Sequence, residues 1–394
     1  MRSLEVSSFG PIKHGEIQFG DLTIFVGPQA SGKSLFAQLF KAIKDSGAIR
    51  KNLKQYGFDW SKDKNPVGAF LSTYLGGGMA SVWQQRTSIK VDGKPYNFRT
   101  RVVKSPPGPR VDKKSVFLIP AQRVLVLQDG WPKPFMGYSP GDPYCMRDFS
   151  ESLRHLMEQG VGSGKAIFPQ AGRLKSQLRK LIDKGIYIGA ELQLHTEGPR
   201  KQIVLCPEGS EATLPYSAWS AGQREFTPLL MGMYWLMPGT KVKRKGDIRT
   251  VIIEEPEMGL HPQAIVSFCL LTLELLWRGY RVILSTHSPV VLDVIWALKE
   301  LSQLEEPVAI KSLKEIFSVE VLGQPVREVF ASALKKDYKV YFFDRTDDEV
   351  EVRDISSLDP GDDDVDIAGW GGLSGFSGRI ADSVGDALCA GSAT

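Results

Sequence analysis

A short loop near the start of the chain, GPQASGKS (27–34), contains the residue types that bind phosphate groups. It fits the pattern G-x-x-x-x-G-K-[ST], with apolar strand formers before it and a helical pattern after it. Glycines let backbone N–H groups turn inward around phosphate oxygens, and the N-terminus of the next helix adds partial positive charge. We expect Lys33 to bridge the β and γ phosphates and Ser34 to ligate Mg²⁺. The predicted nucleotide-binding residues of this loop are Gly27, Pro28, Gln29, Ala30, Ser31, Gly32, Lys33 and Ser34.

Two adjacent carboxylates follow a second run of strand formers, TVIIEEPE (250–257). A phosphate-binding loop alone does not distinguish a GTPase, a kinase and an ATPase. A strand that ends in carboxylates is what a Walker B element needs, with Glu254 holding the magnesium water shell and Glu255 orienting and deprotonating the attacking water. If this pair of glutamates stood alone in the sequence, two exposed side chains at a strand end would explain it better than a Walker B element. Beside a phosphate-binding loop, the pair instead predicts an enzyme that uses ATP and Mg²⁺.

The stretch YSAWSAGQRE (216–225) resembles the signature motif of ABC-type ATPases. Ser220, Gly222 and Gln223 stand in the places of its S-x-G-Q core. Alone, this pattern is weak. Beside the other motifs, it predicts that Ser220, Gly222 and Gln223 contribute to a nucleotide-binding site.

A histidine and a glutamine complete the set of candidate site residues. STHSP (285–289) follows a strand and puts His287 where ABC-type ATPases have their switch histidine, although a lone histidine at a strand end is more often structural. LIPAQR (118–123) offers Gln122 as the Q-loop glutamine. We predict a catalytic role for His287, and both a catalytic and a metal-binding role for Gln122.

These motifs together resemble the ABC-type ATPases of the SMC-like and OLD-like superfamily, which are relatives of DNA-repair and phage-defence ATPases. The opening stretch 9–34 resembles their N-terminal strands and P-loop, and EEPEMGLHP (254–262) resembles their Walker B and D-loop. The matching motifs cover residues 1–40 and 216–295. The resemblance implies an α/β P-loop NTPase fold, namely an ABC-type ATPase head with an N-terminal antiparallel β-subdomain and an inserted helical and loop region.

The chain departs from the family pattern at several positions. Gln29 and Ala30 replace the usual Asn-Gly of the P-loop, which we expect to alter loop contacts without removing phosphate binding. Glu254 stands where the family usually has Asp, and its longer side chain could weaken magnesium positioning. Trp219 precedes the signature serine where Leu is common. The sequence also has no extended coiled-coil pattern and, after His287, no acidic strand-end cluster typical of a fused TOPRIM nuclease.

The resemblance implies a dimer in which two chains enclose two ATP molecules, with Ser220 and Gly222 of one chain contacting the γ phosphate held by the other. The first hypothesis is an ATPase of anti-phage defence that regulates a separately encoded effector, which we expect to be a nuclease. The second is an ATPase that acts directly on DNA in repair or recombination. A transporter nucleotide-binding subunit is disfavoured by the run EPEMGLHP (255–262). A further hypothesis is a scaffold that binds the nucleotide without hydrolysing it. It stays open because Glu254 stands where the family usually has Asp.

The elements that must position these residues follow from hydrophobic patterns. Short alternating strands lead into the P-loop, and SLFAQLFKAIKDS (34–46) has helical spacing after it. A strand at 250–255, a helix at 262–278, a strand at 281–286 and a helix at 289–302 are expected further on, and short helices are expected at 147–160 and 173–183. The predicted division is an N-terminal lobe (1–125), an inserted helical and loop region (126–215), a C-terminal lobe (216–345) and an acidic, then Gly- and Ser-rich tail (346–394).

Composition limits the function classes. The 394 residues are 42% hydrophobic and 24% charged, which is typical of a globular protein. The most apolar helical run (264–277) is too short for a membrane span and carries Glu274. The four cysteines form no CxxC pair, so we expect neither a zinc site nor disulfides, but a reducing cytoplasm. The net charge is +4, and eleven acidic residues lie within 344–366. The remainder of the chain is therefore more basic, which fits nucleic-acid binding and a solvated surface equally well.

Overall fold

The computed structural model describes the chain except for residues 105–112, 162–165, 171, 199, 240–242, 376–377, 381–382, 386 and 388–394. The segments KSPPGPRVDKK (104–114) and KVKRKGDIR (241–249) are the clearest basic clusters of the sequence, and parts of both lie outside the described residues, as does Cys389. Cys145, Cys206 and Cys269 are free thiols.

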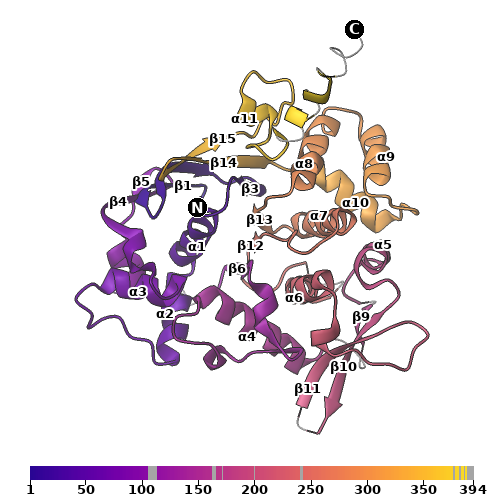
Figure 1. The fold of residues 1–394 in the computed structure, drawn as a ribbon, viewed down its shortest axis with the longest axis horizontal. Coiled ribbons are helices and arrows are strands. Elements are labelled where there is room, and N and C mark those ends of the chain that lie inside the picture. The colour runs from indigo at the N-terminus through magenta and orange to yellow at the C-terminus, as the bar shows by residue number, and fades with distance from the viewer. Residues whose placement is uncertain are drawn as a thin grey trace.

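Ten strands of the described chain form one mixed sheet, which Figure 1 shows running through the molecule. Its spatial order is β5–β4–β1–β2–β15–β14–β3–β13–β12–β6. The strands are β1 (Ser3–Phe9), β2 (Ile12–Gln18), β3 (Leu22–Val26), β4 (Trp83–Val91), β5 (Lys94–Pro95), β6 (Val116–Ile119), β12 (Thr250–Glu254), β13 (Arg281–Ser285), β14 (Tyr338–Thr346) and β15 (Glu349–Asp354).

The half of the sheet that carries the motifs is parallel. Strands β6, β12, β13, β3 and β14 run in the same direction, and Ser285 of β13 pairs with Glu254 of β12 on one side and with Phe25 of β3 on the other. Every residue of β3 and β12 is buried, as expected for strands covered on both faces. Because parallel strands end at the same edge, the segments after Val26, Glu254 and Ser285 must emerge close together.

The N-terminal half of the sheet is antiparallel, which confirms the predicted fold class. Strand β1 pairs antiparallel with β2 and with β4. The hairpin of β14 and β15 joins the two halves, because β14 runs parallel to β3 and β15 parallel to β2. Val350 of β15 is fully buried while Glu349 and Glu351 beside it are exposed. The acidic segment thus contributes a strand to the sheet, beyond the boundary at residue 345 that the sequence suggests.

Helices cover both faces of the sheet (Figure 1). Successive residues of β12 alternate between two cores: Val251 and Ile253 pack in the larger core and Ile252 in the other. The smaller core is covered by α1 (Lys33–Lys44), α2 (Ser46–Gln55) and α3 (Pro66–Leu75). The larger core is covered by α4 (Tyr144–Gln159), α6 (Ala221–Leu236), α7 (Pro262–Trp277), α8 (Pro289–Leu301), α9 (Glu306–Ile316) and α10 (Gln324–Ala333). None of the helices in the described ranges is long and apolar enough to cross a membrane.

The region between residues 126 and 215 contains strands as well as helices. The predicted helices are present as α4 and α5 (Ser176–Ile182). Strands β9 (Ala166–Phe168), β10 (Glu191–Glu197) and β11 (Arg200–Cys206) form a separate antiparallel sheet, and β7 (Leu127–Gln128) pairs with β8 (Trp131–Pro132). Figure 1 shows the β10–β11 hairpin projecting on the side opposite β14 and β15. Short helical turns lie at Met79–Val82, Arg99–Val103, Arg123–Val126, Phe135–Gly137, Asp183–Tyr187, Tyr216–Ala218 and Val365–Ala368.

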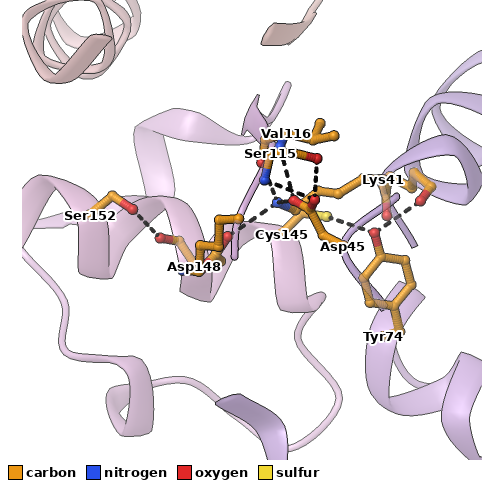
Figure 2. A network of polar contacts seen from close by, with 10 residues as sticks. Lys41, Asp45, Tyr74, Ser115, Val116, Cys145, Asp148 and Ser152 are labelled. Carbon is orange, nitrogen blue, oxygen red and sulfur yellow. Dashed lines mark hydrogen bonds and ion pairs between the residues drawn. The ribbon is translucent and has the colours of Figure 1, made fainter. Parts of the chain in front are cut away.

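A buried polar network fixes the C-terminal end of α1 to β6 and α4 (Figure 2). The Lys41 ammonium donates to the Val116 carbonyl at 2.8 Å and lies 3.7 Å from Asp45 and 3.4 Å from Asp148. Asp45 accepts hydrogen bonds from the backbone N–H groups of Ser115 and Val116 at 2.9 and 3.0 Å. Burial alone would raise the pKa of Asp148, but the charges of Lys114 and Lys41 lower it to about 2. The helix that begins at the P-loop is thereby anchored at its far end.

Candidate active site

The P-loop leaves β3 at Val26 and enters α1 at Lys33. Gly27 and Gly32 have φ angles of 136° and 90°, which favour glycine. A Cβ atom at Gly27 would lie 2.6 Å from the carbonyl oxygen of Phe343, so a side chain would not fit. Ala30 also has a left-handed backbone, with a φ of 57°, at the position where the family has glycine. The substitution therefore keeps the loop shape at a cost of about 1 kcal/mol of backbone strain.

The Lys33 ammonium lies inside this loop. It donates to the carbonyl oxygens of Gly27 and Pro28 at 2.8 and 2.7 Å, and to the Ser31 hydroxyl at 3.3 Å. Burial lowers the pKa of Lys33 to about 8, and the opposing charges of Glu255 and Glu257 limit the decrease. The loop thus gathers a positive charge and the N-terminus of α1 at one point, where a phosphate group could bind.

Glu254 lies at the end of β12 with its carboxylate buried. One oxygen accepts from the side-chain amide of Gln38 at 3.4 Å and the other from the backbone N–H of Ala121 at 3.3 Å. Burial raises the pKa of Glu254 to about 7, although hydrogen bonds from Ala121, Gln38 and Ser34 oppose the rise. Two of the three predicted magnesium ligands, Ser34 and Glu254, are therefore neighbours, and a hydroxyl beside a carboxylate is a donor set that suits Mg²⁺.

Glu255 follows Glu254 and turns toward His287. Its backbone has a φ of 43°, and its N–H donates to the Ser285 carbonyl at 2.9 Å. One carboxylate oxygen lies 3.6 Å from Nε2 of His287, and the two side chains are 30% and 28% exposed. The nearby His287 side chain lowers the pKa of Glu255. An ionised carboxylate that reaches solvent at this edge can accept a proton from water.

Gln122 lies at the same edge, directly after β6, with its side chain exposed. The hydrogen bond from its neighbour Ala121 to Glu254 joins this loop to the end of β12. The predicted residues of the P-loop, Walker B, switch and Q-loop segments thus all lie at the carboxyl ends of the parallel strands.

The signature segment forms the start of α6. The Ser220 hydroxyl accepts from the Gln223 backbone N–H at 3.3 Å, and the Gln223 side chain accepts from the Ser220 N–H at 3.1 Å. The Gln223 amide also donates to the Ile186 carbonyl at 3.3 Å, so both its polar groups have partners within the chain. Trp219 is buried and donates to the Leu214 carbonyl at 3.0 Å, which gives the unusual residue before Ser220 an anchoring role. Ser220 itself is exposed.

The start of α6 packs on the loop that follows Glu255. A Cβ atom at Gly222 would lie 3.0 Å from the Gly259 carbonyl oxygen, so a side chain here would press on the loop and require it to shift. In the part of the chain that the structure describes, the hydrogen bonds of Ser220 run to Gln223 and Arg224 of its own helix, and none reaches the P-loop.

Three polar residues of the site were not predicted: Gln38, Arg123 and Glu257. Gln38 stands one helical turn after Ser34, a spacing that places both on one face of α1. Glu257 accepts a hydrogen bond from the backbone N–H of His287, and burial raises its pKa. Arg123 directly follows Gln122 in the sequence and is fully buried beneath the turn after β12.

Residues 147–293 match the family described as "AAA domain, putative AbiEii toxin, Type IV TA system". No curated protein matches the chain. Among solved structures, an SMC head bound to the C-winged helix domain of ScpA is 11% identical, covers 90% of this chain and 96% of its own, and has a TM-score of 0.44. The SMC head domain from Thermotoga maritima is 12% identical over 90% of this chain and 98% of its own, with a TM-score of 0.36.

The mixed sheet with its parallel half, and the loop between β3 and α1 that carries Lys33, give the chain an α/β P-loop fold. The stretch 147–293 that matches the family contains the predicted signature, Walker B and switch segments but not the P-loop.

Proposed function

We propose that this chain binds ATP with Mg²⁺ and hydrolyses it. The observation that supports this function best is the convergence, at one sheet edge, of Lys33, the pair Ser34 and Glu254, and the pair Glu255 and His287. These residues come from three segments far apart in the sequence and meet only in the folded chain.

In the proposed reaction, backbone N–H groups of the P-loop and the Lys33 ammonium hold the β and γ phosphates. Ser34 and Glu254 would hold Mg²⁺, which when bound neutralises negative charge on the phosphates. Glu255 orients a water molecule and accepts its proton, and His287 keeps the Glu255 carboxylate ionised and in place. A cation beside Glu254 would favour the ionised form of that carboxylate despite its burial.

The glutamate at position 254 does not by itself prevent this chemistry. Its two oxygens are held by Gln38 and Ala121, so the longer side chain has a defined position at the end of β12. This geometry supports magnesium binding more than it supports a scaffold without hydrolysis.

We propose further that the active form is a homodimer or a higher homo-oligomer. Ser220 is exposed at the N-terminus of α6 and forms no hydrogen bond with the P-loop within the described ranges. Free N–H groups and a hydroxyl at a helix start suit an anion. Ser220 and Gly222 of one chain would therefore complete the ATP site of another, with the main-chain start of α6 rather than the Gln223 side chain facing the nucleotide.

For the biological role, we propose that the ATPase regulates a separately encoded effector, which we expect to be a nuclease, in anti-phage defence in the cytoplasm. The name of the matched family, which refers to a toxin–antitoxin system, supports a defence role. Direct action on DNA in repair or recombination is the alternative and requires a basic groove across the dimer. The product of a neighbouring gene that co-purifies with the ATP-bound protein would support the first role, and ATPase activity stimulated by DNA alone would support the second.

The hydrolytic function is tested with Glu255→Gln. An amide can hold the water but cannot accept its proton, so we expect ATP binding to persist and hydrolysis to slow by a factor of about 10² or more. Calorimetry with ATP and a phosphate-release assay measure the two effects. Lys33→Ala is the comparison, because it should abolish ATP binding itself. If Glu254→Gln rather than Glu255→Gln trapped the ATP-bound state, the roles of the two carboxylates would have to be exchanged, and unchanged ATP affinity in Lys33→Ala would overturn the P-loop assignment.

A further inference from the structure

Arg123 is fully buried and connects the two motifs that the proposed dimer would use at different ATP molecules. Its Nη1 donates to the carbonyl oxygens of Glu254 and Glu255, both at 3.1 Å, and its Nη2 donates to that of Pro256 at 3.3 Å. Three successive carbonyls of the Walker B turn thus bind one guanidinium.

The other side of Arg123 faces α6. Its Nε donates to the Glu225 carbonyl at 3.1 Å, and its Nη2 lies 3.5 Å from the Glu225 carboxylate, which is 13% exposed. Glu225 stands on the first turns of the helix that Ser220 caps. A single rigid, planar group therefore spans from the residue beside the signature motif to the turn that carries Glu255.

The contacts of Arg123 explain the backbone of Glu255. A non-glycine residue with a φ of 43° is strained and persists only where its surroundings fix it. The bonds from Arg123 to the carbonyls of residues 254–256 supply that constraint. A displacement of α6 would pull on the guanidinium and so move the Glu255 turn, and the reverse also holds.

We propose that Arg123 is a positioning residue that couples Glu255 to the signature helix of the same chain, so that the nucleotide state at the P-loop is transmitted to Ser220. This inference rests on the proposed ATP site. Coupling of this kind is reciprocal, because the effect of one site on the other must be equal in both directions. In a dimer, a chain with ATP at its own P-loop would thereby adjust the serine that it presents to its partner.

The coupling can be measured without hydrolysis and without a dimer. Hydrogen exchange is recorded at protein concentrations where the chain is monomeric, with and without an ATP analogue that is not hydrolysed. In the wild type, the analogue should slow exchange both at the P-loop and at residues 221–225. In Arg123→Lys, whose single ammonium cannot span both sides, slowing should persist at the P-loop and be lost at 221–225.

A second variant guards against misfolding of Arg123→Lys. Glu225→Gln keeps the size of the side chain and removes only the ion pair on the α6 side. It should weaken the effect at 221–225, leave ATP affinity within about threefold of the wild type, and lower kcat at least about fivefold with little change in KM. The matched control is Glu158→Gln, which removes an exposed ion pair with Arg154 on α4 and should change none of these quantities.

The outcomes separate the two proposals. If the analogue does not protect the P-loop of the wild type, the ATP site itself is wrong. If the analogue protects both the P-loop and residues 221–225, and does so to the same extent in Arg123→Lys and Glu225→Gln as in the wild type, the ATP site is supported and the coupling role of Arg123 is refuted.

Discussion

At the scale of single residues, the P-loop carries an alanine in a backbone conformation that favours glycine. Ala30 has a φ of 57° and its side chain is exposed, so it gains little from packing. The neighbouring glycines, Gly27 and Gly32, have no such freedom to change, because a Cβ at either would come within 3 Å of another group. Among these three positions of the loop, position 30 can therefore hold a side chain, but its backbone is strained.

Ala30→Gly should therefore stabilise the fold, by up to about 1 kcal/mol, since relief of left-handed strain outweighs the extra entropy of glycine in the unfolded chain. Urea unfolding measures the change. Ala37→Gly, in the interior of α1, is the comparison and should destabilise by about 1 kcal/mol or more. A loss of stability in Ala30→Gly would show that the loop is not strained at this residue.

At the scale of elements, helix α1 is held at both ends by polar groups. Its N-terminus closes the P-loop through Lys33, and its C-terminal half is tied to β6 and α4 by Lys41, Asp45 and Asp148 (Figure 2). The network reaches toward the site as well, because the Tyr74 hydroxyl donates to the backbone carbonyl of Gln38 at 2.9 Å, and the Gln38 side chain binds Glu254. The position of α1, and with it the phosphate loop, depends on these buried charges.

Asp148→Asn should lower the free energy of unfolding by roughly 3 kcal/mol at pH 7, because the buried Lys41 ammonium then has only the Asp45 carboxylate beside it. The folded pKa of Asp148, about 2, lies below its ordinary value of 3.8, so the stabilisation is fully present above about pH 4 and declines as the pH falls toward 2. Urea unfolding of the wild type and the variant from pH 7 to pH 3 measures this difference, which should shrink at the acidic end. Asp247→Asn, which breaks an exposed pair with Lys113, is the control and should cost less than about 1 kcal/mol. A difference that stayed constant with pH would rule out the charge of Asp148 as the cause.

At the scale of the whole molecule, one chain brings together the residues predicted to bind phosphate and magnesium but leaves Ser220 exposed on α6. A two-chain ATP site accounts for this arrangement. In such a site, Ser220→Arg would fill the space beside the partner's γ phosphate, so we expect nucleotide binding by the monomer to persist while hydrolysis and ATP-driven association are lost.

Mixing Ser220→Arg with Lys33→Ala chains tests the two-chain site directly. Each mixed dimer has one site with both defects and one with neither. An equal mixture, in which half of the dimers are mixed, should recover up to about a quarter of the wild-type ATPase rate if one intact site can turn over alone. Full activity of Ser220→Arg at concentrations where no dimer forms would mean that Ser220 is only a helix cap.

The sequence alone determined the local units of this protein. The strand, loop and helix around Lys33, the strand that ends at Glu254 and the strand before His287 follow from hydrophobic periods and short motifs, because their conformations depend on residues close in the chain. The tertiary structure decided which distant groups these units meet. Arg123 binds carbonyls 102 to 133 positions away, and β15 lies between β14 and β2 although its sequence reads as an exposed acidic run. Burial of a charge depends on what the rest of the fold places around it, and no pattern within Arg123's own segment records that.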